Sequence, residues 1–149
     1  MNLSPHLLHR RMSVKEGFLT TLIEITPTPI LPETIINKVR KDAYGCVVTF
    51  IGTVRGFSSG KRVLLLEFNA KAKGQVEKEI QQIAEEIQAR WQLEDIAICH
   101  RMGRLKVGEI TLVIAIAAPH RQEAFAACQY AVDRLKQIAP LWKREATES

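Results

Sequence analysis

The chain has 149 residues, 46% of them hydrophobic and 25% charged, with a formal net charge of +5. This composition is ordinary for a globular domain, and no apolar run approaches the roughly 20 residues that cross a bilayer. The first residues lack the apolar core and cleavage site of a secretory signal. We therefore expect a cytoplasmic protein with an anionic partner, in which residues 1–17 are a mobile extension and residues 18–149 form a single domain.

The apolar pattern of the first half predicts a strand, a helix and a hairpin. Residues 18–26 alternate as in a strand, and in segment 31–42 Pro32 suits the first turn of an amphipathic helix. Two runs, 46–55 and 62–70, have the composition of strands and flank the turn-forming sequence GFSSGK. We expect these two runs to pair with each other as a hairpin.

Residues 74–91 carry the clearest helical pattern in the chain, with apolar residues at three- and four-residue steps. The predicted buried face consists of Val76, Ile80, Ile83, Ile87 and Trp91. Four glutamates lie on the other face, where we expect water to solvate them: Glu77, Glu79, Glu85 and Glu86.

Two more strands, 95–103 and 109–118, follow around a turn at Gly108, and a last helix begins near Pro119 and ends at Pro140. The predicted core stripe of that helix contains Ala124, Phe125, Cys128, Ala131, Leu135 and Ile138. The resulting order, β-α-β-β-α-β-β-α, predicts an α+β fold in which helices pack on one mainly antiparallel sheet.

The three cysteines, Cys46, Cys99 and Cys128, lie far apart among apolar neighbours. No CxxC pair exists, so we expect neither a metal site nor a disulfide framework. We interpret these cysteines as small buried hydrophobic residues.

Candidate functional residues are cations at the ends of predicted elements. His120 and Arg121 stand at a helix start, which attracts anions and disfavours cations, so they bind a ligand or merely face solvent. Arg55 ends a strand beside a polar loop and has the same two interpretations.

The sequence LKQIAPLWKRE (135–145) places cations around one tryptophan. Helix-dipole stabilisation explains Lys136 adequately, whereas Lys143 and Arg144 follow Pro140. If Trp142 is buried, Lys143 is held near the body of the protein, and crowded cations favour the neutral amine that acts as a base or nucleophile. A solvated basic tail is the alternative.

Several functional classes lack support in the sequence. There is no phosphate loop of the GxGxxG or GxxxxGK[ST] kind, no HExxH and no GxSxG. A basic module that binds nucleic acid remains an alternative, although the sequence has no exposed aromatic residues between the cations and no known nucleic-acid-binding motif.

Four stretches stand out together along the chain: GCVVTFIGTVRG (45–56), HRMGRLKVGE (100–109), APHRQEAF (118–125) and LKQIAPLWKREAT (135–147). In this order and spacing they resemble the family of large, catalytic subunits of molybdopterin synthase. The resemblance implies an α/β-hammerhead type of fold and a homodimer. Each chain of that dimer would hold one small ubiquitin-like sulfur-carrier subunit with a Gly-Gly tail, which makes a heterotetramer.

The resemblance also implies the reaction. Cyclic pyranopterin monophosphate would become molybdopterin by receiving two sulfurs, each from the thiocarboxylated C-terminus of a fresh carrier. Because the partner supplies the sulfur, the family needs no catalytic cysteine, no metal and no cofactor in this chain. A degenerate subunit that binds the partner without turnover is a further alternative.

Carried over residue by residue, the resemblance implies a substrate-binding set of Thr53, Val54, Arg55, His120, Arg121, Lys136, Lys143, Arg144 and Glu145. Within this set, Lys136 and Lys143 are the implied catalytic residues. The family also implies that the His120–Arg121 pair reaches the site of the neighbouring subunit.

Overall fold

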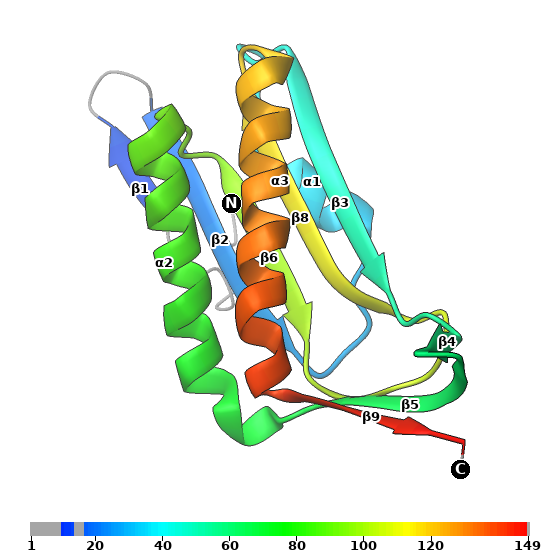
Figure 1. Ribbon diagram of the computed structural model, residues 1–149. Coiled ribbons are helices and arrows are strands. Elements are labelled where there is room, and N and C mark those ends of the chain that lie inside the picture. The colour runs from blue at the N-terminus through cyan, green and yellow to red at the C-terminus, as the bar shows by residue number, and fades with distance from the viewer. Residues whose placement is uncertain (1–9, 14–16, 149) are drawn as a thin grey trace.

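The computed structural model describes residues 10–13 and 17–148, whose strands form two sheets (Figure 1). The main sheet contains, in spatial order, β1 (Arg10–Ser13), β2 (Gly17–Thr26), β6 (Ile96–Arg101), β8 (Ile110–Ala118) and β3 (Cys46–Thr53). The second sheet contains β4 (Phe57–Ser58), β5 (Lys61–Phe68) and β7 (Gly103–Leu105), and β9 (Lys143–Thr147) pairs with β5. The helices are α1 (Pro32–Val39), α2 (Lys73–Trp91) and α3 (Arg121–Ile138), and single 3₁₀ turns occupy Ala70–Ala72 and Ala139–Leu141.

The pairing confirms the predicted α+β class with mainly antiparallel strands. In the main sheet, β1–β2, β6–β8 and β8–β3 are antiparallel, and β2–β6 is parallel. A parallel pair needs a long crossover connection. Here the segment between the two strands contains α1, β3, β5 and α2.

Helices cover both faces of the main sheet, with α2 and α3 on one face and α1 on the other (Figure 1). Successive residues of a strand point to opposite faces. Ile96 and Ile98 accordingly pack in the core under α2 and α3, whereas Ala97 and Cys99 pack in the core under α1. This two-sided burial explains the continuous apolar run of β6.

Helix α2 buries four of its five predicted core residues, and Trp91 is half-buried. In α3, however, Phe125 is 60% exposed, so its predicted place in the core is wrong. The buried stripe of α3 contains Ala124, Ala127, Cys128, Ala131 and Leu135. Phe125 follows Ala124 by one residue, which at 3.6 residues per turn rotates its side chain off that stripe.

The predicted hairpin between 46–55 and 62–70 is also wrong, because β3 pairs with β8 and β5 belongs to the second sheet. The turn itself is present, since Ser59 and Gly60 have φ values of 51° and 77° and join β4 to β5. Positive φ at both central residues suits a tight hairpin turn. That turn closes a short ladder of two residue pairs.

Residues 10–13 of the predicted mobile extension pair with β2. Residues 1–9 and 14–16 lie outside the described residues, so for them the extension stays a prediction. Among the helices that the structure describes, none is long and apolar enough to cross a membrane.

All three cysteines are free; Cys99 and Cys128 are buried, as predicted, and Cys46 is half-buried. Burial raises the pKa of the Cys99 thiol to about 12 and that of Cys128 to about 11. Neither is a thiolate at neutral pH, so neither acts as a nucleophile there. Within the described part of the chain, no group of three or more His, Cys, Asp or Glu side chains is placed to hold a metal ion.

Candidate active site

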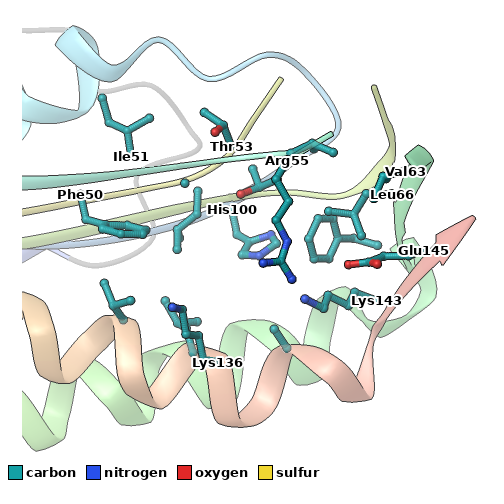
Figure 2. Close-up of a pocket in the computed structure, with 18 residues that line it drawn as sticks. Phe50, Ile51, Thr53, Arg55, Val63, Leu66, His100, Lys136, Lys143 and Glu145 are labelled. Atoms are coloured by element: carbon teal, nitrogen blue, oxygen red, sulfur yellow. The ribbon is translucent and has the colours of Figure 1, made fainter. Parts of the chain in front are cut away.

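A cavity of about 540 Å³ lies where the end of β3, the C-terminal part of α3 and the second sheet meet (Figure 2). Its apolar wall comes from Phe50, Ile51, Val54, Val63, Leu66, Phe68, Leu112, Val132, Leu135 and Ala139. Its polar lining comes from Thr53, Arg55, His100, Thr111, Lys136, Lys143 and Glu145. A concave, largely apolar space with a few convergent polar groups is the usual form of a small-molecule site.

Thr53, Val54 and Arg55 reach the cavity because β3 leaves the main sheet at this point. The register of β3 against β8 shifts between Gly52 and Thr53. Val54 is then held by two backbone hydrogen bonds, its N–H to the Glu109 carbonyl at 2.9 Å and its carbonyl from the Gly108 N–H at 2.8 Å. The chain therefore enters the loop in a fixed conformation, and Arg55 points into the cavity (Figure 2).

Lys143 is positioned by the tryptophan before it. Trp142 is 6% exposed, and its ring packs against His100 at a centroid distance of 5.0 Å and Phe68 at 6.1 Å. The Trp142 carbonyl accepts a hydrogen bond from the Asn69 N–H at 2.9 Å. The side chain of Lys143 extends from this anchored backbone into the cavity that Lys136 also lines.

Arg144 and Glu145 are adjacent on β9 but have different surroundings. Glu145 lines the cavity. Arg144 does not line it; its guanidinium, 77% exposed, binds the Glu67 carboxylate at 3.1 Å, and Arg104 binds the same carboxylate at 3.0 Å. The structure thus places Arg144 in an ion-pair cluster on the outer side of the second sheet.

His120 and Arg121 are not in this cavity. They border a separate hollow of about 450 Å³ at the start of α3, together with Gly45 and Cys46. Lys136 lies near the other end of α3, and a rise of 1.5 Å per residue puts the two ends roughly 25 Å apart. One chain therefore does not bring the His120–Arg121 pair and the lysines together.

His100 lines the cavity but was not among the predicted site residues. It is 3% exposed, and its Nδ1 lies 2.6 Å from the Arg101 carbonyl oxygen. Burial lowers the pKa of His100 to about 4; the Arg101 carbonyl opposes this shift, and the positive charge of Lys143 adds to it. The available signal was a histidine at the end of an otherwise apolar strand, a position that sequence alone does not distinguish from a core histidine.

An α+β domain in which one cavity gathers one arginine and two lysines beside an apolar wall is of the class that binds or transforms an anionic small molecule. More specifically, the chain belongs to the family of molybdopterin synthase catalytic subunits, because the family model described as MoaE protein matches residues 25–138. This match confirms the family that the sequence motifs indicated.

Individual relatives agree with this assignment. The molybdopterin synthase catalytic subunit of Bacillus subtilis is 47% identical over 84% of this chain and 79% of its own length. The Thermoplasma volcanium subunit is 39% identical over 88% of this chain and 95% of its own.

Solved structures give the same result. The crystal structure of molybdopterin synthase from Staphylococcus aureus has a TM-score of 0.75 and 36% identity, and covers 85% of this chain and 91% of that chain. A protein–protein complex of subunits 1 and 2 of molybdopterin-converting factor from Helicobacter pylori is similar in fold, with a TM-score of 0.60, 18% identity and 85% of both chains covered.

Proposed function

We propose that this chain converts cyclic pyranopterin monophosphate to molybdopterin, taking two sulfurs in turn from the thiocarboxylated C-terminus of a small ubiquitin-like carrier subunit. The observation that carries the proposal is the cavity itself, which joins Arg55, Lys136 and Lys143 to an apolar wall in a member of this family. An anionic, largely flat ring system matches both parts of that lining.

The three cations have different chemical capacities. The Arg55 guanidinium is planar and always charged, which suits binding to a cyclic phosphate. Lys136 and Lys143 act in proton transfer or in transient bonding to the carrier tail or the substrate, because an amine can lose its proton. Among the described residues that line this cavity, Glu145 supplies the one carboxylate.

The carrier tail enters the same cavity in this proposal. A Gly-Gly terminus has no side chains, so it fits a narrow approach, and its anionic end is attracted to the lysines. Once a sulfur has been transferred to the substrate and the acyl–sulfur bond is hydrolysed, the tail leaves as a carboxylate. The Helicobacter pylori protein of similar fold was solved as a complex of two subunits, which is the kind of assembly proposed here.

We also propose a homodimer in which His120 and Arg121 of one chain complete the site of the other. The separation of this pair from Lys136 along α3 supports the proposal, since the pair does not reach its own cavity. With two carrier subunits, the assembly is a heterotetramer. The free thiols of the described cysteines agree with work in the reducing cytoplasm.

A single-turnover assay tests the proposed function. Purified protein is mixed with thiocarboxylated carrier and cyclic pyranopterin monophosphate, and the dithiolene product is measured. Product formation is the expected result. A stable complex with the carrier but no product would instead favour a partner-binding subunit without turnover.

Absence of both product and complex would overturn the proposal. It would favour the alternative that the basic residues bind nucleic acid. That alternative predicts binding to generic DNA or RNA that weakens steeply with added salt.

A further inference from the structure

We propose that His100 is a substrate-binding residue, whose Nε2 accepts a hydrogen bond from an N–H or O–H group of the pyranopterin ring system. This inference rests on the proposed function and adds a residue to its site. It begins from the position of His100 at the end of β6, buried at the base of the cavity (Figure 2).

The imidazole ring is held in one orientation by three neighbours. The Phe68 ring packs edge-on at a centroid distance of 4.5 Å, and the Trp142 ring does the same at 5.0 Å. In the ring plane, Nδ1 lies 2.6 Å from the Arg101 carbonyl oxygen. Reorienting the ring would break both aromatic contacts and this hydrogen bond.

The hydrogen bond to Arg101 determines the tautomer. A carbonyl oxygen can only accept, so Nδ1 must carry the hydrogen. In the neutral ring Nε2 then has a lone pair and no hydrogen, which makes it an acceptor. Among the described residues Nε2 has no hydrogen-bond partner, and it is not one of the fully buried unpaired atoms, so it is open to the cavity, where a bound ligand can donate to it.

The ring stays neutral at physiological pH. Burial lowers the pKa of His100 to about 4, and the charge of Lys143 acts in the same direction. Arg55 and Lys136 also line the cavity, while Glu145 is the one carboxylate among the lining residues that the structure describes. His100 therefore presents an uncharged hydrogen-bond acceptor in a cavity whose charged side chains are mostly cationic donors.

This acceptor suits a specific part of the substrate. The cations of the cavity can bind the phosphate but cannot accept from a ring N–H. Thr53 and Thr111 have hydroxyls that rotate and serve as donor or acceptor, whereas the lone pair of His100 is fixed in direction. A fixed neutral acceptor discriminates in favour of ligands that place a donor there.

Two amide substitutions separate the two ring nitrogens. In His100→Asn the side-chain NH₂ can replace Nδ1 and keep the bond to the Arg101 carbonyl, but no acceptor reaches the position of Nε2. In His100→Gln the longer side chain can place its oxygen near that position but loses the bond to Arg101. Both variants lose the aromatic contacts, so each controls for the other.

The dissociation constant of cyclic pyranopterin monophosphate is measured by calorimetry for the wild type and both variants, with thermal unfolding in parallel. We expect about tenfold weaker binding for His100→Asn and less than about threefold for His100→Gln, consistent with one lost hydrogen bond. Wild-type affinity in His100→Asn, or equal loss in both variants, would overturn the inference while leaving the proposed function intact. A wild-type protein that binds no pyranopterin would overturn the proposed function itself.

Discussion

Lys143 lies directly opposite Phe68 in the antiparallel ladder of β5 and β9. Phe68 belongs to the core under α2 and α3, whereas the Lys143 side chain is exposed to the cavity. The backbone of a proposed catalytic residue is thereby attached to the rigid part of the molecule. Placement of this kind lowers the entropic cost of bringing the amine to a reacting group.

Removing either lysine amine is expected to abolish most of the activity without unfolding the protein. For Lys136→Ala and Lys143→Ala we expect single-turnover rates at least about 100-fold lower, the usual effect of losing a proton-transfer group. Thermal unfolding should stay close to wild type because both side chains are exposed. Lys38→Ala, on α1, is the matched control and should keep its rate. Full sulfur transfer by both variants would contradict the proposal.

Truncating the tryptophan that anchors β9 is expected to affect stability and activity together. Trp142→Ala should lower the free energy of unfolding by about 3–5 kcal/mol, since a large buried ring leaves a cavity. It should also slow sulfur transfer, because Lys143 is no longer held. Urea unfolding and the single-turnover assay measure the two effects, and Trp142→Phe should retain more of both. An active, stable Trp142→Ala protein would show that β9 is positioned by other contacts.

Mixed dimers test whether one chain completes the site of the other. The double variant His120→Ala/Arg121→Ala and the variant Lys143→Ala should each be nearly inactive alone. A mixed dimer has one site with no substituted residue, so random mixing should restore about a quarter of wild-type activity. If mixing restores nothing while the chains exchange, the shared site is wrong.

The low pKa of His100 predicts an acid-sensitive stability. The unfolded chain binds a proton near the ordinary pKa of 6.5, whereas the folded protein resists protonation until about pH 4. Stability is therefore complete above about pH 6.5 and falls as the pH drops toward 4, by about 2 kcal/mol at pH 5. In urea titrations across this range, His100→Phe should show a smaller loss between pH 7.5 and 5 than wild type. Parallel profiles for the two proteins would rule out this contribution.

Glu86 predicts a second, smaller pH effect. Its carboxylate accepts hydrogen bonds from Arg134 at 2.8 and 3.1 Å and from the Tyr130 hydroxyl, so it joins α2 to α3 and is not simply solvated as predicted. The bonds from Arg134 are the largest cause that lowers the pKa of Glu86. A lowered folded pKa means that the stabilisation is present above about pH 4.5 and is lost as the pH falls through the folded value.

Glu86→Gln should therefore cost up to about 1 kcal/mol at pH 7 and less near pH 3, measured by chemical unfolding. Glu85→Gln, on the exposed part of the same helix, is the control and should cost almost nothing. Equal costs for both glutamates would contradict this role.

Sequence periodicity was sufficient for elements whose signal is local. The α2 stripe of Val76, Ile80, Ile83 and Ile87 is buried as predicted, because the spacing of apolar residues in a long amphipathic helix is enough to identify its buried face. Strand partners were harder. The choice of β8 over β5 as the partner of β3 depends on contacts far along the chain, which local pattern does not encode.

The candidate site was predicted only in part, because some of its features also depend on contacts far along the chain. Charge and placement at element ends indicated Arg55 and Lys143, the family resemblance added Lys136, and all three line one cavity. His100 was missed because its function depends on the surrounding Phe68 and Trp142 rings, which are distant in sequence. Arg144 lies outside the cavity that the residues on either side of it line, because successive side chains of a strand point to opposite faces.

The position of β9 has a consequence for synthesis of the protein. The described strands of the main sheet precede it in the chain, so a ribosome that has released residues up to Trp142 has already supplied those strands and helices α1, α2 and α3. Lys143 and Glu145 are synthesised afterwards, pair with β5 and complete the lining of the cavity. The proposed catalytic residue Lys143 is thus added to the site only after the main sheet has been synthesised.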